Sequence, residues 1–185
     1  MQRWPERVDT ERLELRTWRE DDAEALAVAI SSCLDHLLPW MPWAAFEPLA
    51  IEERLKLIRE WDEQWQQGNG VVYGVFLDGA IVGGSGFHQR IGPGAIEIGY
   101  WVHADHTRRG FASEATAALT DVAFTREDIE RVEIHHDRAN APSAGVPRAL
   151  GYELVRETPD AVDAPGEEGV DCTWIVTRER WQARA

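Results

Sequence analysis

The 185-residue sequence contains a single lysine, Lys56, among its 19 basic residues. A Walker-type phosphate loop ends in Lys followed by Ser or Thr, whereas Lys56 lies in a stretch with helical periodicity. Nucleotide triphosphatases of that class are therefore excluded. The only two cysteines, Cys33 and Cys172, are too few for a disulfide framework and too isolated for a zinc site. We expect two reduced thiols, although the sequence leaves a pairing between them open.

Long hydrophobic runs are also absent. No 18 consecutive apolar residues occur, and the first seven residues have mixed charge with no apolar segment behind them. We therefore expect a cytoplasmic protein without a membrane segment. Acidic residues outnumber basic ones by 33 to 19, which gives a formal charge of −14. This charge opposes non-specific binding to nucleic acid and to anionic membranes, and it favours a cationic partner.

The chain is long enough for one ordinary domain, and 44% of its residues are hydrophobic, so we expect a single folded domain over residues 1–185. Alternation of apolar and polar residues predicts strands, and apolar residues at helical spacing predict helices. No internal repeat interrupts this pattern. It predicts an α/β (α+β) fold with a largely antiparallel first half and a βαβ unit later. The expected strands are 10–18, 71–77, 80–87, 95–103, 131–136, 152–156 and 172–178, and the expected helices are 19–31, 48–67, 109–126 and 140–150.

The most informative segment covers residues 96–115, where a strand enters a short loop and a helix begins at Gly110. The first amides of a helix have no backbone partner and its dipole favours an anion, while glycine allows a ligand to approach the backbone closely. Arg108 and Arg109 add positive charge suited to a diphosphate. The alternative is an ordinary capped helix with two solvated arginines. A second motif downstream, Asn140-Ala141-Pro142-Ser143 followed by Leu150-Gly151-Tyr152, favours the functional interpretation.

With these two motifs on one chain, the sequence resembles the GNAT superfamily of acyl-CoA-dependent N-acetyltransferases. Within it, the chain is similar to the RimJ/RimL branch, which acetylates protein N termini. The resemblance implies a central, mostly antiparallel twisted sheet of about seven strands flanked by about four helices, with acetyl-CoA as cosubstrate. The segments that carry it are Thr-Glu-Arg-Leu-Glu-Leu-Arg at 10–16, Leu38-Pro39-Trp40-Met41-Pro42-Trp43, Ile98-Gly99-Tyr100-Trp101-Val102, Gly110-Phe111-Ala112-Ser113-Glu114-Ala115, the downstream motif, and Trp-Ile-Val-Thr-Arg-Glu-Arg-Trp at 174–181.

The resemblance also implies which residues hold acetyl-CoA. The strand at 100–102 pairs its backbone with the pantetheine arm, the loop and first helical turn bind the pyrophosphate, and Asn140 contacts amide groups of the cosubstrate. Thr107 stands where the superfamily often has Gln or Arg, which removes one side-chain contact. Pro147 is unusual and should kink or shorten its helix, whereas Pro142 suits a first helical turn. The predicted residues are Tyr100, Trp101, Val102, Thr107, Arg108, Arg109, Gly110, Phe111, Ala112, Ser113, Asn140 and Ser143.

For catalysis the resemblance implies a base that receives the proton of the amine and an acid for the leaving thiolate. Glu97 is one candidate base, Asp163 in the acidic loop 160–169 is a second and His88 is a third; a water chain is the remaining option. Ser143 is the candidate acid. Each has a plainer alternative, since Glu97 can be a solvent-facing strand residue, a lone histidine is more often structural, and Asn140 can serve as a helix cap.

Trp40 and Trp43, on a proline-rich loop, are candidates for lining the acceptor site together with His88, although core packing is the usual role of tryptophan. His135 and His136 are adjacent in a strand and point to opposite faces, so they cannot chelate one ion, and we expect no metal. The expected reaction is acetyl transfer to a primary amine, most of all a protein N-terminal α-amine. The alternatives are a cationic small molecule, such as an aminoglycoside or polyamine, and a non-catalytic acyl-CoA-binding module. A homodimer is left open.

Overall fold

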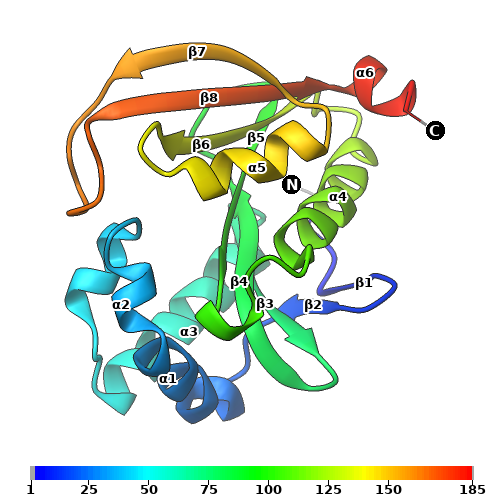
Figure 1. Ribbon diagram of the computed structural model, residues 1–185. Coiled ribbons are helices and arrows are strands. Elements are labelled where there is room, and N and C mark those ends of the chain that lie inside the picture. Colours follow the sequence, from blue (N-terminus) through cyan, green and yellow to red (C-terminus); the bar gives the residue numbers. More distant parts are fainter. Residues whose placement is uncertain (1–2, 185) are drawn as a thin grey trace.

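The computed structural model describes residues 3–184, whose strands form one eight-stranded sheet in the order β1-β2-β3-β4-β5-β6-β8-β7 (Figure 1). All neighbours are antiparallel except β5 and β6, which are parallel. The strands are β1 (Arg7–Asp9), β2 (Glu14–Thr17), β3 (Gly70–Leu77), β4 (Ala80–His88), β5 (Ala95–Val102), β6 (Arg131–Asp137), β7 (Glu153–Pro159) and β8 (Val170–Thr177). The α-helices are α1 (Ala23–Ser32), α2 (Leu34–Leu37), α3 (Ile51–Gln67), α4 (Phe111–Phe124), α5 (Ala141–Ala149) and α6 (Arg178–Gln182).

The predicted mixed fold and its antiparallel first half are confirmed, but two numbers need correction. Residues 3–184 form eight strands rather than seven, because β1 was missed, and six α-helices rather than four, because α2 and α6 were missed. β1 has three residues, Arg7, Val8 and Asp9, which are too few for a strand pattern to be recognised. α2 and α6 contain four and five residues, too few to display a helical period.

The β3–β4 hairpin shows how local sequence determines this architecture. Asp78 and Gly79 both have positive φ, 49° and 83°. Two such residues form the tight turn whose twist matches that of antiparallel strands. Asp-Gly supplies this geometry with little strain, and the predicted hairpin is confirmed.

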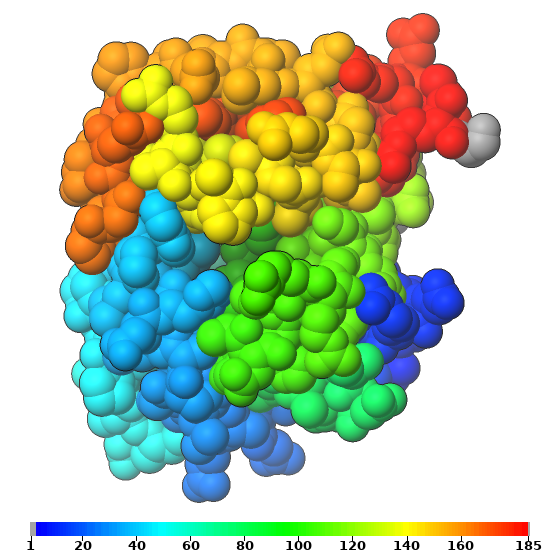
Figure 2. All heavy atoms as spheres, viewed as in Figure 1, coloured from blue at the N-terminus to red at the C-terminus, as the bar shows by residue number. Residues whose placement is uncertain are grey.

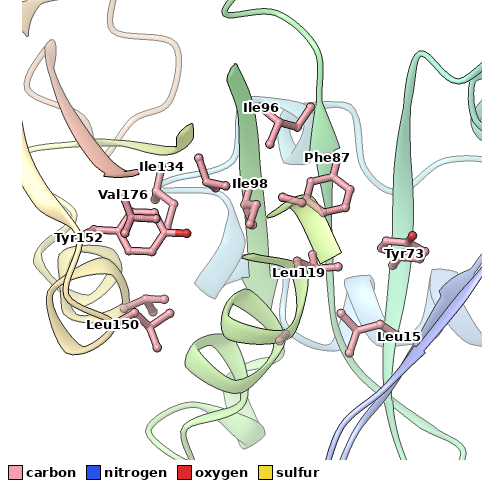
Figure 3. Close-up of a cluster of buried hydrophobic side chains, with 14 of the residues drawn as sticks. Leu15, Tyr73, Phe87, Ile96, Ile98, Leu119, Ile134, Leu150, Tyr152 and Val176 are labelled. Carbon is pink, nitrogen blue, oxygen red and sulfur yellow. The ribbon is translucent and has the colours of Figure 1, made fainter. Parts of the chain in front are cut away.

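Each face of the sheet has its own core. On one face, α4 and α5 cover a cluster that includes Ile98, Leu119 and Ile134 (Figure 3). On the other face, α3 packs on β3 and α1 packs on β4, around a smaller cluster that includes Leu26, Ile58 and Phe76. Cys33 lies in the second cluster and Cys172 in the first; both are buried and free, as expected.

The parallel strands β5 and β6 separate after a short paired section. They pair only from Ala95 to Glu97 and from Arg131 to Glu133, although β5 continues to Val102 and β6 to Asp137. The second half of β5 keeps β4 as its neighbour on one edge. Its other edge faces the opening between the strands, which we call the splay. In the space-filling view the surface is hollowed where α5, the segment at 104–112 and α2 meet (Figure 2).

No helix within residues 3–184 combines the length and apolar character needed to cross a membrane.

Candidate active site

The loop before α4 presents a helix N-terminus to the end of β5. Gly110 is the N-cap residue of α4, with φ of 81°, and no side chain caps the helix there. Arg108 is also left-handed, with φ of 58°. Such a conformation is uncommon for a residue with a side chain and occurs often at binding sites. The N-terminus of α4 therefore has no side-chain cap, and its role as an anion-binding site stays a prediction.

The N-terminal segment holds this loop in place, which the sequence did not suggest. The Glu114 carboxylate, in the first turn of α4, accepts hydrogen bonds from the Thr10 hydroxyl at 2.5 Å and from Arg12 Nε at 2.7 Å. Arg12 also donates to the carbonyl of Arg109 at 3.1 Å. Burial raises the pKa of Glu114, but these hydrogen bonds more than offset it, so the pKa lies below its ordinary value. A charged side chain four positions after a glycine is the only available sequence signal.

The basic residues of the loop differ in their contacts. Arg109 donates to His106 Nδ1 at 3.0 Å and lies over the ring of Phe111, 4.8 Å from its centroid. Arg108 is exposed. The Thr107 hydroxyl donates to the Ala104 carbonyl at 3.0 Å and thus serves the local turn.

The predicted cosubstrate residues of β5 and α4 meet in space. Tyr100, Trp101 and Val102 line a small pocket together with Phe111 and Ala112. The outer edge of this half of β5 has no strand partner within residues 3–184, so its peptide groups can pair with an extended ligand such as a pantetheine arm.

Glu97 lies at the point where β5 and β6 separate. Its side chain is 6% exposed and both carboxylate oxygens are bound by Arg90, one of them by Nε at 2.7 Å. His88 pairs with Glu97 in the sheet and packs over Gly99, where a Cβ would come within 2.9 Å of His88 Nε2. Burial lowers the pKa of His88, opposed by the nearby Glu97 charge, so the imidazole is neutral at pH 7.

A second group of ionisable side chains lies beside Glu97 on the same face. His135 bonds Asp171 through Nδ1 at 3.1 Å and Glu133 through Nε2 at 3.1 Å. Burial lowers the pKa of His135, but the two carboxylates outweigh it and the pKa is raised. His136 points to the other face and accepts a hydrogen bond from Trp174, as the alternation predicts. Residues 3–184 contain no group of three or more His, Cys, Asp or Glu side chains arranged to hold a metal ion.

Ser143 approaches the splay from the other face of the sheet. Asn140 caps α5 by accepting a hydrogen bond from the Ser143 amide at 3.3 Å, so its simpler predicted role is present. α5 continues past Pro147 to Ala149, so the proline does not shorten it as expected. The Tyr100 hydroxyl lies 3.0 Å from the Ser143 carbonyl and 3.1 Å from its Oγ, a contact that the sequence did not reveal. Side chains alternate along β5, so Tyr100 and Glu97 point to opposite faces of the sheet. Ser143 lies on the same face as Tyr100.

The predicted acceptor-side residues lie at different distances from this arrangement. Trp43 stacks edge-on against Trp101, with ring centroids 6.2 Å apart, and is therefore at the end of β5. Trp40 is half-buried in the preceding turn. Asp163 is exposed, and its side chain makes no hydrogen bond or ion pair within the described chain. The loop that carries Asp163 contacts the segment 38–43, which contains Trp40 and Trp43. There the Gly166 amide donates to the Pro39 carbonyl at 2.9 Å.

A larger hollow of about 500 Å³ lies between α1 and the β3–β4 turn and includes His103. Ser32 Oγ is 2.9 Å from His103 Nε2, which resembles a nucleophile and its base. However, the Asp105 amide donates to His103 Nδ1, so the neutral ring carries its proton on Nε2 and donates to Ser32. Ser32 in turn donates to the Ala29 carbonyl. The serine is therefore not activated, and this hollow contains none of the predicted site residues.

Sequence comparisons find relatives that are named as N-acetyltransferases. YdaF of Bacillus subtilis (strain 168), provisionally named a ribosomal N-acetyltransferase, is 29% identical over 144 residues, which cover 77% of this chain and 78% of YdaF. The uncharacterised N-acetyltransferase p20 of Bacillus licheniformis is 27% identical over 150 residues, covering 80% of this chain and 83% of p20.

Solved structures establish the fold. RimL, described as a ribosomal L7/L12 alpha-N-protein acetyltransferase in complex with coenzyme A, superposes with a TM-score of 0.86 at 24% identity, over 95% of this chain and 99% of that chain. Mycobacterium smegmatis RimJ gives a TM-score of 0.82 at 24% identity, over 95% and 89% of the two chains. A family model described as an acetyltransferase (GNAT) domain matches residues 12–153, most of the chain, and the chain therefore belongs to the GNAT family of acetyl-CoA-dependent acetyltransferases.

Proposed function

We propose that this protein acetylates a primary amine and that its preferred acceptor is a protein N-terminal α-amine. The observation that carries the proposal is the splay itself. It lies between the uncapped N-terminus of α4 and two polar groups, Glu97 and Ser143, that approach from opposite faces of the sheet. The names of YdaF and RimL, which refer to ribosomal substrates, support a protein acceptor.

Acetyl-CoA supplies the activated thioester, and this chain supplies the groups that hold it. We assign the pantetheine arm to the free edge of β5 beyond Gly99 and the pyrophosphate to the first amides of α4. The exposed Arg108 guanidinium and Arg109 add positive charge there. The negative surplus elsewhere on the surface attracts the ammonium form of the acceptor.

Glu97 is the proposed base. A terminal α-amine has a pKa of about 7.7–8.0, so a fraction is neutral at physiological pH and only modest assistance is needed. Glu97 retains lone pairs beside its Arg90 contact and receives the proton directly or through one water. His88, neutral at pH 7, is the next candidate. Asp163 ranks last because its side chain is exposed and makes no hydrogen bond or ion pair within the described chain.

Ser143 is the proposed acid. As the amine displaces the thiolate, the Ser143 Oγ–H bond breaks and an S–H bond forms, while Glu97 takes the proton that the amine loses. Solvent then returns Ser143 and Glu97 to their starting protonation states. Placing acid and base on opposite faces allows both transfers at one tetrahedral centre.

The proposal is tested with acetyl-CoA and a panel of amines, by mass spectrometry and by release of free thiol. The panel contains peptides with free N termini, the same peptides with a blocked N terminus and an internal lysine, aminoglycosides and polyamines. We expect acetylation of free N termini and little acetylation of the blocked peptides. If only an aminoglycoside is acetylated, the acceptor is a cationic small molecule and not a protein N terminus. If acetyl-CoA binds but no amine is acetylated, the protein is a non-catalytic binding module.

A further inference from the structure

Pro147 leaves one carbonyl of α5 without its normal helical partner. In an α-helix the carbonyl of residue i accepts a hydrogen bond from the amide of residue i+4. For Ser143 that amide would belong to residue 147, and proline has no N–H. The helix nevertheless continues to Ala149, and the Tyr100 hydroxyl donates to the Ser143 carbonyl at 3.0 Å. A side chain from β5 therefore replaces the missing helical hydrogen bond.

The same hydroxyl also holds the Ser143 oxygen in place. Tyr100 has one hydroxyl proton, and a carbonyl can only accept, so that proton is directed to the Ser143 carbonyl. The 3.1 Å contact between the two hydroxyl oxygens is then satisfied when Ser143 Oγ donates to Tyr100, and rotation about the Cβ–Oγ bond turns that proton to the leaving sulfur without moving Oγ. The Ser143 amide is bound by Asn140. Tyr100 and Asn140 thus hold the amide, the carbonyl and the hydroxyl of Ser143.

We propose that Tyr100 is a positioning residue for acetyl transfer, whose hydroxyl fixes the rotamer of Ser143 at the splay. This inference rests on the proposed role of Ser143 as the acid. The assignment gives the Tyr100 side chain a task separate from the backbone role expected for β5. It also accounts for Pro147. Because proline has no N–H, Pro147 leaves the Ser143 carbonyl available to Tyr100.

The ionisation of Tyr100 is compatible with this role. Burial raises its pKa to about 12, an effect only partly opposed by the hydrogen bond from Ser143. The phenol therefore keeps its proton at any pH at which an α-amine is acetylated. It acts as a permanent donor to the Ser143 carbonyl.

The test compares Tyr100→Phe with Tyr73→Phe. Tyr73 is a buried tyrosine of β3 whose hydroxyl donates to the Pro5 carbonyl at 2.5 Å, so the control also removes one hydroxyl contact. We expect Tyr100→Phe to lower kcat roughly tenfold, less than the roughly hundredfold or more that a direct acid or base contributes. The KM for the amine and the Kd for acetyl-CoA should change less than about twofold, and Tyr73→Phe should keep the wild-type kcat. Wild-type kcat in Tyr100→Phe would overturn the proposal.

A double-mutant cycle separates positioning from general destabilisation. With Ser143 already changed to Ala, Tyr100→Phe should cause no further loss of kcat, because residues that act as a unit are not additive. An equal fractional loss in both backgrounds would contradict the proposal.

A crystal structure of Tyr100→Phe gives an answer that does not depend on turnover. We expect Ser143 Oγ to occupy more than one rotamer in the variant and a single rotamer in the wild type. A single unchanged rotamer overturns the positioning role even if the wild type acetylates amines. Conversely, if the wild type acetylates nothing, the proposed function fails while the rotamer measurement still decides what Tyr100 does.

Discussion

The two faces of β5 and β6 differ in kind although the same strands build both. Toward α4 and α5, Ile98 and Ile134 are about 1% exposed and lie in the main core. Toward the other face, Glu97, Glu133 and His135 form ion pairs with their neighbours. Alternation with a period of two lets one strand anchor a core and present a polar group every second residue. The comparison teaches that the main core and the proposed base Glu97 can be changed separately, because they lie on opposite faces of the sheet.

The largest expected effect is on the apolar face. Ile134→Ala should lower the free energy of unfolding by about 2–5 kcal/mol, because it removes buried methyl groups and leaves a cavity. The matched control is Ile175→Ala on β8, which pairs with Glu133 and is only half-buried on the charged face. It should cost less than half as much. Denaturant unfolding measures both, and equal losses would break the distinction between the faces.

On the charged face we expect lost activity with retained stability. Glu97→Gln removes the proposed base and should lower kcat about a hundredfold, the lower range of acid–base contributions. Stability should change little, because the remaining partner, Arg90, has a side chain that is 68% exposed. Rates are measured at a pH where most of the amine is neutral, alongside urea unfolding. The control is Glu133→Gln, which pairs with Glu97 in register but is held by Arg131 and His135. If both variants lose kcat equally, Glu97 has no special role.

Gly110 tests whether the N-terminus of α4 is a binding element as well as the end of a core helix. Gly110→Val places a β-branched residue at φ of 81° and should weaken acetyl-CoA binding tenfold or more as the first turn rearranges, an estimate based on about 1–2 kcal/mol for a left-handed residue. Gly79→Val carries similar strain, at φ of 83° in the β3–β4 turn, where a Cβ meets no atom within 4 Å. Calorimetry should give an unchanged Kd for that control. Equal Kd values for both variants would contradict the assignment of the pyrophosphate to the N-terminus of α4.

Several parts of the site were predictable because they depend on local sequence. Gly110 predicted the beginning of α4, Asn140 predicted the N-cap of α5, and Asp78-Gly79 predicted the β3–β4 hairpin. Each reflects backbone conformation within a few residues, which residue type strongly limits.

The missed features depend on contacts between distant segments. The Thr10 and Arg12 contacts to Glu114 span about a hundred positions, and the Tyr100 contact to Ser143 spans 43. No periodicity encodes them, because they exist only once the sheet has brought the segments together. Pro147 was visible as an anomaly in the sequence, but the partner that compensates for it was not.

The smallest expected effect compares two histidines that lie on the charged face in different surroundings. His88 faces Glu97 and Arg90, and burial lowers its pKa, so its contribution to stability is present above pH 6.5 and is lost as pH falls. His135 lies between Asp171 and Glu133, which raise its pKa above 6.5 despite burial. Its contribution is present below pH 6.5 and is lost as pH rises.

Replacing each histidine with Gln should therefore give pH profiles of opposite slope. We expect the stability advantage of the wild type over His135→Gln to grow from pH 8.5 to pH 5.5, because protonated His135 gains both carboxylates. The advantage over His88→Gln should shrink across the same range, because a buried imidazole without a dedicated carboxylate resists protonation. Urea unfolding at each pH measures the stability of the wild type and of both variants. Parallel slopes for His88 and His135 would mean that the two histidines have similar electrostatic surroundings. The proposed difference between a neutral histidine beside Glu97 and a salt-bridged histidine beside Glu133 would then be wrong.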